Sequence, residues 1–334
     1  MSVYIIAEAG VNHNGNYEVA KQMIEQAKWA GCDCIKFQSF KAENLVTKDA
    51  PMAKYQIKNL NQQDSQFNML KKLELSQQAF INLKNYAASL CIDFLSTPFD
   101  EASAEDLYNL GVTQFKVSSG DLTNKPLLQK LACYNKRLLI STGMADLNEI
   151  DEAVQWVYTC GNRNVVLFHC TTNYPTPYED VNMNAMLTLK KRYNLPVGYS
   201  DHTEGIEIAL MAVSMGAIMI EKHFTLDKTM PGPDQKASLE PGELKKMVDS
   251  IRNIEKAFGT GDKVPTLSEQ CLISAARKSL VYTRDIYIGE TIQPDDIICK
   301  RPGNGILPKY KENIIGKTVK KNCYRDTLVK EGDV

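Results

Sequence analysis

Short apolar runs alternate with amphipathic stretches along the first part of the chain. The apolar runs are typical of buried parallel strands. They lie at residues 4–7, 34–37, 94–95, 114–117, 138–140, 165–168, 196–198 and 218–220. Between them apolar residues recur at helical spacing, as at Val19, Met23, Ile24, Ala27 and Ala30, which predicts helices with one face against a sheet. Eight strand signals alternating with helices over about 250 residues predict an α/β fold, a (β/α)8 TIM barrel.

An open doubly wound sheet is the alternative for this alternation. Such sheets bind dinucleotides through a Gly-x-Gly-x-x-Gly turn after the first strand. Here the first apolar run is followed by Glu-Ala-Gly-Val-Asn-His, which lacks that turn. The barrel is therefore favoured.

The alternation is broken twice. Residues 41–75 are polar and long, which predicts an extended loop carrying a helix; it belongs either to the active site or to a surface insertion without a role. After Phe258 the composition becomes that of a linker, and Ser268 begins a short helix. We predict a catalytic barrel at residues 1–258, a linker at 259–276 and a small β-rich domain at 277–334. A domain of about 60 residues is marginal alone and gains stability by packing on another.

Composition narrows the class of protein. Hydrophobic residues make up 43% and charged residues 24% of the chain, and the net charge is −1, which gives no reason to expect a nucleic-acid or membrane partner. Nine cysteines are scattered without a Cys-x-x-Cys pair, as in a reducing compartment. The chain enters its first strand without a basic leader, and its longest apolar run is shorter than the roughly 20 residues of a membrane span. We expect a soluble, cytoplasmic protein.

Two of the only four histidines follow neighbouring predicted strands. His202 and His223 come after residues 196–198 and 218–220, and each lies beside an acid, Asp201 and Glu221. In a parallel barrel the strand ends meet at one face, so the two imidazoles converge there. Hydrogen-bonded structural histidines are the alternative. Because imidazole pairs suit a divalent ion with open positions for water and substrate, the pattern favours a metal site.

Lysines and hydroxyls also gather at predicted strand ends. Lys36 and Lys116 each end a strand signal, and Ser119 and Ser141 follow the fourth and fifth. Either lysine alone could be an ordinary salt-bridge residue. Together with hydroxyls and exposed backbone amides they predict a site for a small phosphorylated or carboxylated substrate.

A series of motifs in a fixed order then identifies a family resemblance. The motifs are A-E-A-G-V-N-H-N-G, K-F-Q-S-F, S-T-P-F-D, S-S-G-D, S-T-G-M, Y-P-T-P, Y-S-D-H-T, E-K-H-F-T and K-R-P-G-N-G-I. The chain resembles the bacterial sialic acid synthases, the phosphoenolpyruvate-dependent N-acetylneuraminate synthase family, which includes legionaminate and pseudaminate synthases. The resemblance covers nearly the whole chain, including a C-terminal antifreeze-like SAF domain.

The resemblance implies a reaction and a set of site residues. The barrel would condense phosphoenolpyruvate with an open-chain 2-acetamido sugar and water, giving a nine-carbon 2-keto acid and phosphate. His202 and His223 would hold a divalent metal, Mn²⁺ first and Mg²⁺ or Co²⁺ as alternatives. The phosphoenolpyruvate-binding residues would be Lys36, Thr97, Lys116, Ser119, Ser141 and Ser200. The sugar would meet Glu8, Gln38, Tyr174 and Asp234, and either Glu8 or Asp234 would be the base that activates water.

The resemblance also implies a partner. Arg301 of the SAF domain would reach the N-acetyl group in the barrel of a second subunit, which makes a domain-swapped homodimer. A SAF domain that folds back onto its own barrel is the alternative.

Three functional alternatives stay open. Within the family, K-Y-Q-I-K-N and S-T-P-F-D-E favour N-acetylmannosamine as the sugar and N-acetylneuraminate as the product, with 2,4-diacetamido-2,4,6-trideoxymannose and legionaminate as the alternative. A Schiff-base aldolase would use Lys116 as nucleophile. A binding protein would carry the C-terminal module on an inactive barrel, but the expected histidines and lysines are all present.

Overall fold

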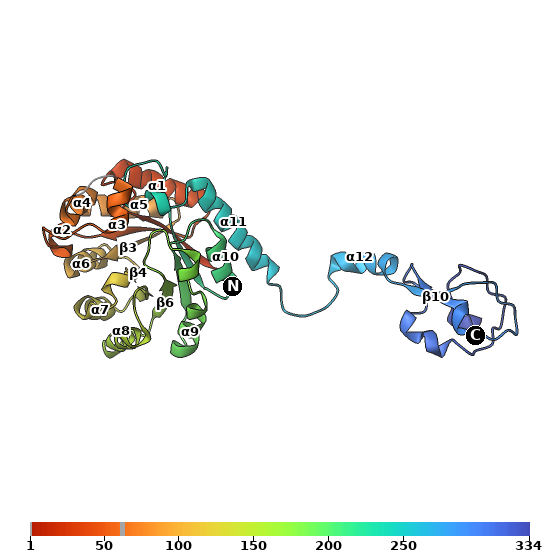
Figure 1. Ribbon diagram of the computed structural model, residues 1–334. Helices are drawn as coiled ribbons and strands as arrows, with labels where there is room; N and C mark the ends of the chain where they lie inside the picture. Colours follow the sequence, from red (N-terminus) through yellow and green to blue (C-terminus); the bar gives the residue numbers. More distant parts are fainter. Residues whose placement is uncertain (1, 61–63) are drawn as a thin grey trace. The chain divides into compact units, whose positions relative to one another are not determined.

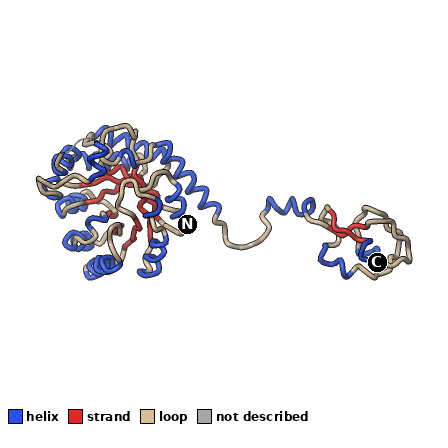
Figure 2. The backbone as a smooth tube through the Cα atoms, viewed as in Figure 1, coloured by secondary structure: helices blue, strands red, loops and turns tan. Residues whose placement is uncertain are grey.

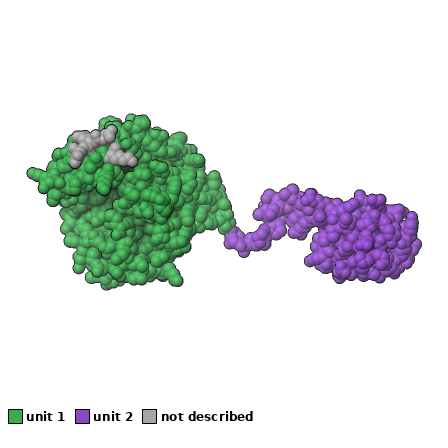
Figure 3. Space-filling view, viewed as in Figure 1, with its two compact units in different colours: residues 1–259 green, residues 260–334 purple. Residues whose placement is uncertain are grey.

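The chain forms two compact units, Met1–Gly259 and Thr260–Val334 (Figure 3). The structure is a computed structural model that describes residues 2–60 and 64–334. Among these residues no helix is both long enough and apolar enough to cross a membrane.

The first unit is a barrel of eight parallel strands surrounded by helices (Figure 1). The strands are β1 (Tyr4–Gly10), β2 (Cys34–Ser39), β3 (Asp93–Pro98), β4 (Gln114–Val117), β5 (Arg137–Ser141), β6 (Val165–Cys170), β7 (Val197–Asp201) and β8 (Met219–His223). Their hydrogen-bonded order is β3-β2-β1-β8-β7-β6-β5-β4, and β3 also lies against β4. The predicted TIM barrel is confirmed, and each apolar run of the sequence falls on one of these strands or at its edge.

The helices that follow the strands cover the outside of the barrel. They are α1 (Tyr17–Ala30), α5 (Gln77–Ser89), α6 (Glu101–Asn109), α7 (Lys125–Cys133), α8 (Leu147–Thr159), α9 (Asn184–Tyr193), α10 (Glu207–Ser214) and α11 (Pro241–Ala257). Their starts are fixed locally: the Asn16 side chain accepts from two backbone amides of α1, and Asp146 and Glu149 form a capping box at α8.

Successive residues of each strand point alternately outwards to the helices and inwards to the middle of the barrel. Outward residues such as Ile5, Ile35 and Ile140 pack under the helices. Inward residues form a small apolar layer, made of Ile6, Cys34, Leu95, Leu139, Val166, Phe168 and Met219. This layer closes the middle of the barrel, so that inward side chains nearer the C-terminal strand ends are left to line a cavity.

The long segment after β2 folds into three short helices. They are α2 (Ala42–Leu45), α3 (Lys54–Leu60) and α4 (Gln66–Leu73), where the sequence predicted a loop with one helix. Met52, Met69 and Leu73 of this segment form an apolar cluster with Val11 and Phe40 from the loops after β1 and β2. The segment is therefore packed onto the loops at the C-terminal end of the barrel.

The second unit has its own small core. It holds α12 (Leu267–Ala276) and the antiparallel strands β9 (Ser279–Tyr282) and β10 (Ile297–Lys300), joined mostly by turns (Figure 2). Its core includes Leu280, Tyr282, Ile286, Ile292 and Ile297. The nine cysteines of the chain are free thiols.

Candidate active site

A cavity of about 330 Å³ opens among the C-terminal ends of the barrel strands. All the predicted site residues of the barrel line it, and together they come from all eight strands or the loops after them. They are Glu8, Lys36, Gln38, Thr97, Lys116, Ser119, Ser141, Tyr174, Ser200, His202, His223 and Asp234. Residues spread over more than two hundred positions thus meet around one space.

The floor of the cavity is a buried cluster of two lysines and two carboxylates. Lys116 Nζ lies 3.0 Å from Glu221 Oε1, and Lys36 Nζ lies 2.9 Å from Glu8 Oε1 and 3.6 Å from Glu221 Oε1. Lys36 also donates to Thr97 Oγ1 at 3.0 Å, and Ser200 Oγ donates to Glu221 at 3.1 Å. The charged side chains are almost fully buried, which is tolerated because each has a partner of opposite sign.

The two carboxylates of this cluster differ in their readiness to ionise. Burial raises the pKa of Glu8 to about 7, against the opposing attraction of Lys36. Burial also opposes ionisation of Glu221, but Lys116 and Lys36 outweigh it and lower the pKa of Glu221 to about 2. Glu221 is thus the fixed anion of the cluster, whereas Glu8 can gain or lose a proton near neutral pH.

Glu221 is a site residue that sequence analysis missed. The sequence singled it out only as an acid beside His223. A signal was available, because inward-facing positions alternate along a barrel strand and Glu221 is two residues before His223. Its lysine partners, however, are on β2 and β4, and only the folded barrel brings them to it.

A rim of hydroxyls borders the lysines. Ser119 Oγ accepts from the Gly143 N–H at 3.1 Å. The Oγ of Ser141 is buried without a hydrogen-bond partner among the described residues, and so is Thr172 Oγ1. A Cβ at Gly143 would lie 2.8 Å from Ser119 Oγ and 2.4 Å from Thr172 Oγ1, so only glycine fits there. Unpartnered hydroxyls in the same cavity as two ammonium groups are suited to binding a phosphate or carboxylate.

The two histidines face each other above this cluster. Their ring centroids are 5.4 Å apart. His202 Nδ1 lies 2.7 Å from the Thr171 carbonyl oxygen, which fixes the tautomer and leaves Nε2 as an acceptor. His223 Nδ1 is buried without a partner among the described residues. Burial lowers the pKa of both histidines, to about 4 for His202, so both are neutral at physiological pH.

This pair fits a divalent metal with few protein ligands. Neutral imidazoles with free ring nitrogens are suitable donors, and the orphaned His223 Nδ1 marks unused donor capacity. Within the described ranges no group of three or more His, Cys, Asp or Glu is placed to hold an ion. Among the described residues, a metal held by His202 and His223 would thus have no third His, Cys, Asp or Glu ligand, which leaves positions open for water or substrate.

The mouth of the cavity combines aromatic rings, one acid and an apolar wall. The Tyr174 ring lies 4.2 Å from that of His202 and 5.4 Å from that of Tyr55, centroid to centroid. Burial raises the pKa of Asp234 to about 6. The apolar wall consists of Val11, Phe40, Leu45, Val46, Met69, Leu70, Leu73 and Phe99. Much of it comes from the 41–75 segment, which is therefore part of the site. Sequence analysis gave none of these side chains a place in the site, nor Tyr55, although some of them lie within the quoted motifs.

The predicted Arg301 and the other two histidines of the chain, His13 and His169, do not line this cavity. Arg301 is exposed in the second unit, where its Nε donates to the Ala276 carbonyl at 3.1 Å; its contact with sugar stays a prediction. His13 and His169 are held by local hydrogen bonds, His13 Nδ1 by the Gly15 N–H and His169 Nε2 by the Val181 carbonyl.

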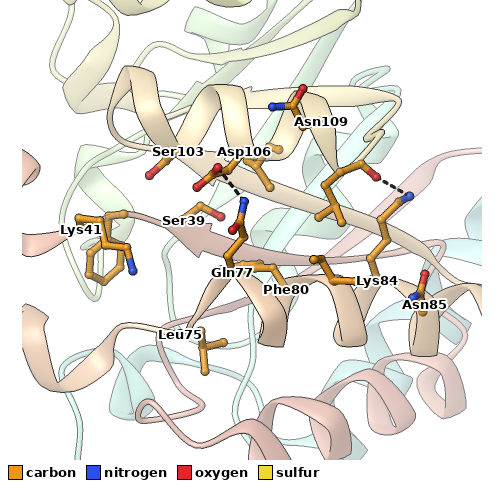
Figure 4. A pocket seen from close by; sticks show the side chains of 14 residues that line it. Ser39, Lys41, Leu75, Gln77, Phe80, Lys84, Asn85, Ser103, Asp106 and Asn109 are labelled. Atoms are coloured by element: carbon orange, nitrogen blue, oxygen red, sulfur yellow. Dashed lines mark hydrogen bonds between the residues drawn. The ribbon is translucent and has the colours of Figure 1, made fainter.

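A separate cavity lies on the flank of the barrel, between α5 and α6 (Figure 4). Its volume is about 390 Å³. Gln77 bonds to Asp106 and Lys84 bonds to the Leu110 carbonyl across it. Phe40 lines both cavities, but none of the predicted site residues lines this one.

Comparison with known proteins follows the same division of the chain. The NeuB family matches residues 23–263, and the SAF domain matches residues 277–334. The chain is 50% identical to N,N'-diacetyllegionaminic acid synthase of Campylobacter jejuni, over 98% of each chain. It is 37% identical to human N-acetylneuraminate-9-phosphate synthase, over 98% of this chain and 91% of the human one. Among solved structures, the N-acetylneuraminic acid synthetase of Leptospira borgpetersenii in complex with citrate is 37% identical, with a TM-score of 0.71 over 82% of this chain and 90% of that one.

Proposed function

Because the chain belongs to the NeuB family, we propose that it joins phosphoenolpyruvate to open-chain 2,4-diacetamido-2,4,6-trideoxymannose, giving N,N'-diacetyllegionaminate and phosphate. The family consists of synthases that form a carbon–carbon bond from phosphoenolpyruvate, and the family resemblance drawn from the motifs is confirmed. The observation that carries the proposal is one buried cavity in which two lysines, a rim of hydroxyls and a histidine pair meet.

The choice of sugar rests on two further observations. Relatives of Campylobacter jejuni and Legionella pneumophila that are 50% and 47% identical to this chain are N,N'-diacetyllegionaminic acid synthases. In addition, apolar side chains form much of the outer wall of the cavity, beside Gln56 and Gln66. A sugar whose aldehyde meets the histidines extends its far carbons towards that wall. A C6 methyl group is buried there without cost, whereas a C6 hydroxyl needs a hydrogen-bond partner. N-acetylmannosamine, which the sequence favoured, is the second candidate.

Phosphoenolpyruvate would bind over the lysine cluster. Lys36 and Lys116 supply two positive charges in a water-poor space, where charge-assisted hydrogen bonds to phosphate and carboxylate are strong. The unpartnered Ser141 hydroxyl and Ser119 add donors. Glu221 holds both ammonium groups in place before the substrate arrives, so the site is preorganised.

His202 and His223 would hold a divalent ion, with Mn²⁺ as the first candidate and Mg²⁺ or Co²⁺ as alternatives. When bound, the ion supplies a Lewis acid that polarises the aldehyde oxygen of the sugar. The chain itself orients the two imidazoles through the Thr171 carbonyl and the Tyr174 ring, and the apolar wall keeps bulk water away.

The bond-forming step joins C3 of phosphoenolpyruvate to C1 of the sugar. Water adds to C2, where positive charge develops, and a proton is delivered to the former aldehyde oxygen, which becomes the new hydroxyl group. The tetrahedral intermediate then expels phosphate by cleavage of the bond between C2 and the phosphate oxygen, which leaves the keto group. Glu8 is suited to accept the proton of that water, since a carboxylate with a pKa of about 7 is partly ionised at neutral pH and still basic. Asp234, with a pKa of about 6, is the other candidate.

Phosphate release from phosphoenolpyruvate tests the proposal. We expect release that requires a sugar, is faster with the diacetamido sugar than with N-acetylmannosamine, stops after chelation and returns with Mn²⁺. Faster release with N-acetylmannosamine would assign the second product, N-acetylneuraminate. Release that ignores the chelator, with an adduct trapped by borohydride, would contradict the metal mechanism and support a Schiff base at Lys116, whose pKa burial lowers.

The quaternary arrangement is part of the proposal. We expect a homodimer in which the SAF domain of one subunit brings Arg301 to the sugar in the barrel of the other.

A further inference from the structure

A completely buried ion pair lies directly behind the two histidines. Lys222 Nζ is 2.7 Å from Asp201 Oδ2, and both side chains are 0% exposed. Asp201 and Lys222 are opposite each other in the β7–β8 ladder, at its last paired position. His202 directly follows Asp201 in the sequence, and His223 directly follows Lys222.

The pair extends into a network that encloses His202. Asp201 Oδ1 accepts from both the N–H and the hydroxyl of Thr203, at 2.9 and 2.8 Å. Lys222 also donates to the Thr203 carbonyl at 2.6 Å. Asp201 and Thr203, which flank His202, are therefore hydrogen-bonded to each other. Both also contact Lys222, the residue before His223.

Stability alone does not account for this pair. Taking two charges out of water is costly, and apolar residues of similar volume usually serve as well or better. Neither Asp201 nor Lys222 lines the active-site cavity, because alternation along a strand directs them away from it while Ser200 and Glu221 point in. What the pair does supply is a rigid, directional link between the ends of two strands.

We propose that Asp201 and Lys222 are positioning residues, which fix the separation of the His202 and His223 imidazoles for metal binding. A metal held by only two protein ligands depends strongly on their geometry, since no third side chain corrects an error. The inference rests on the proposed metal site.

Mn²⁺ binding to the metal-free protein tests the inference without reference to turnover. Asp201→Asn keeps the shape of the side chain and the bonds from Thr203 but removes the charge that holds Lys222. We expect Mn²⁺ affinity, measured by electron paramagnetic resonance titration, to fall about 10-fold or more, as for other groups that orient metal ligands. Thr203→Val, which removes one hydrogen bond of the network, should give a smaller loss.

A double-mutant cycle tests whether Asp201 and Lys222 act on Mn²⁺ affinity as one ion pair or independently of each other. Asp201→Asn/Lys222→Met should bind Mn²⁺ no more weakly than Asp201→Asn alone, because the link is broken once. Asp33→Asn is the matched control: it removes an ion pair with Arg252, 2.8 Å long, at the opposite end of the barrel. We expect this control to keep the Mn²⁺ affinity of the wild type.

The KM for phosphoenolpyruvate at saturating Mn²⁺ distinguishes a specific effect on the histidines from a general loss of order in the active site, because only the latter would also raise this KM. We expect the KM to stay within about twofold in Asp201→Asn, since the lysines of that site are on other strands. Unchanged Mn²⁺ affinity in folded Asp201→Asn would overturn the inference, and so would a parallel loss of both affinities. If Lys222→Met does not fold, Asp201→Asn and Thr203→Val decide the question. A wild type that binds no Mn²⁺ would overturn the proposed metal site, and the inference with it.

Discussion

At the scale of single residues, charge pairing inside the barrel decides what the cavity can bind. Glu221 lies between Lys36 and Lys116 and favours the charged form of both buried lysines. Against the effect of burial, this attraction raises the pKa of Lys36, whereas burial still lowers the pKa of Lys116. The proposed binding of phosphate therefore depends on an acid as much as on the lysines.

Lys116→Met tests this pairing. The change removes one of the two cations and leaves Glu221 buried with only Lys36. We expect kcat/KM for phosphoenolpyruvate to fall by roughly 100-fold or more, because a charge-assisted hydrogen bond is lost in a water-poor site. Mn²⁺ affinity should stay within a few-fold of the wild type. Lys84→Met, in the cavity between α5 and α6, is the control that should leave kcat/KM unchanged; an equal effect in both variants would contradict the assignment.

Asp234 gives a prediction about stability and pH. Burial raises its pKa from 3.8 to about 6, so the folded protein holds this proton more tightly than the unfolded chain. Its contribution to stability therefore falls as pH rises from about 4 to about 6, and the cost of the buried charge is fully present above pH 6. We expect metal-free Asp234→Asn to be more stable than the wild type near pH 8, by on the order of 2 kcal/mol.

Denaturant unfolding at several pH values measures this difference. The gap between Asp234→Asn and the wild type should narrow as pH falls from about 6 to about 4 and close below about pH 3, where the wild-type carboxyl is protonated in both states. A gap that does not change with pH would contradict the raised pKa.

At the scale of elements, the inserted segment supplies part of the mouth of the barrel. Leu45 of α2 and Met69, Leu70 and Leu73 of α4 belong to the apolar wall, and Tyr55 and Gln56 of α3 also line the cavity. Asn59 connects α3 to the loop of Asp234 by donating to the Pro233 carbonyl at 2.6 Å.

Leu70→Gln tests the role of this wall. Leu70 lines the cavity and is partly exposed, so a polar side chain can be placed there without breaking the core. We expect kcat/KM for the diacetamido trideoxy sugar to fall about 10-fold relative to that for N-acetylmannosamine, because the wall then offers a partner to a C6 hydroxyl. Leu187→Gln, an exposed position on α9, is the control. An unchanged ratio between the two sugars would show that selectivity lies elsewhere.

At the scale of the whole molecule, the two units have separate cores and one of them carries the cavity. The apolar core of the barrel is made of residues of the first unit. A chain that ends at residue 259 should therefore fold, bind Mn²⁺ and bind phosphoenolpyruvate. It should lose condensation by about 100-fold or more, if Arg301 supplies a contact to the sugar. Full activity of the truncated chain would contradict a catalytic role for the SAF domain.

Subunit mixing tests the predicted swap. Arg301→Ala and Lys116→Met subunits should each be inactive as homodimers. In a mixed dimer, the intact barrel of one meets the intact Arg301 of the other, so mixing with subunit exchange should restore about a quarter of wild-type activity. No restoration after proven exchange would indicate that Arg301 acts on its own barrel.

Much of this protein could be predicted from local patterns. Short continuous apolar runs and amphipathic stretches of period 3.6 are visible without an alignment, and eight strand signals that alternate with helices leave few folds to choose from. Because active sites of such barrels lie at the C-terminal strand ends, the same pattern selected Lys36, Lys116, His202 and His223. The order of the motifs along the chain then indicated the family.

The sequence by itself determined that the lysines, histidines and hydroxyls at the strand ends reach the cavity, because strand phase and strand end are local properties. Only the tertiary structure decided how those side chains pair. Glu221 meets lysines that lie 105 and 185 positions away, and the 41–75 segment becomes a wall only when it packs on the loops of β1 and β2. Pairing and packing depend on barrel closure, which brings distant strands within a few ångströms; no local pattern along the chain records those distances.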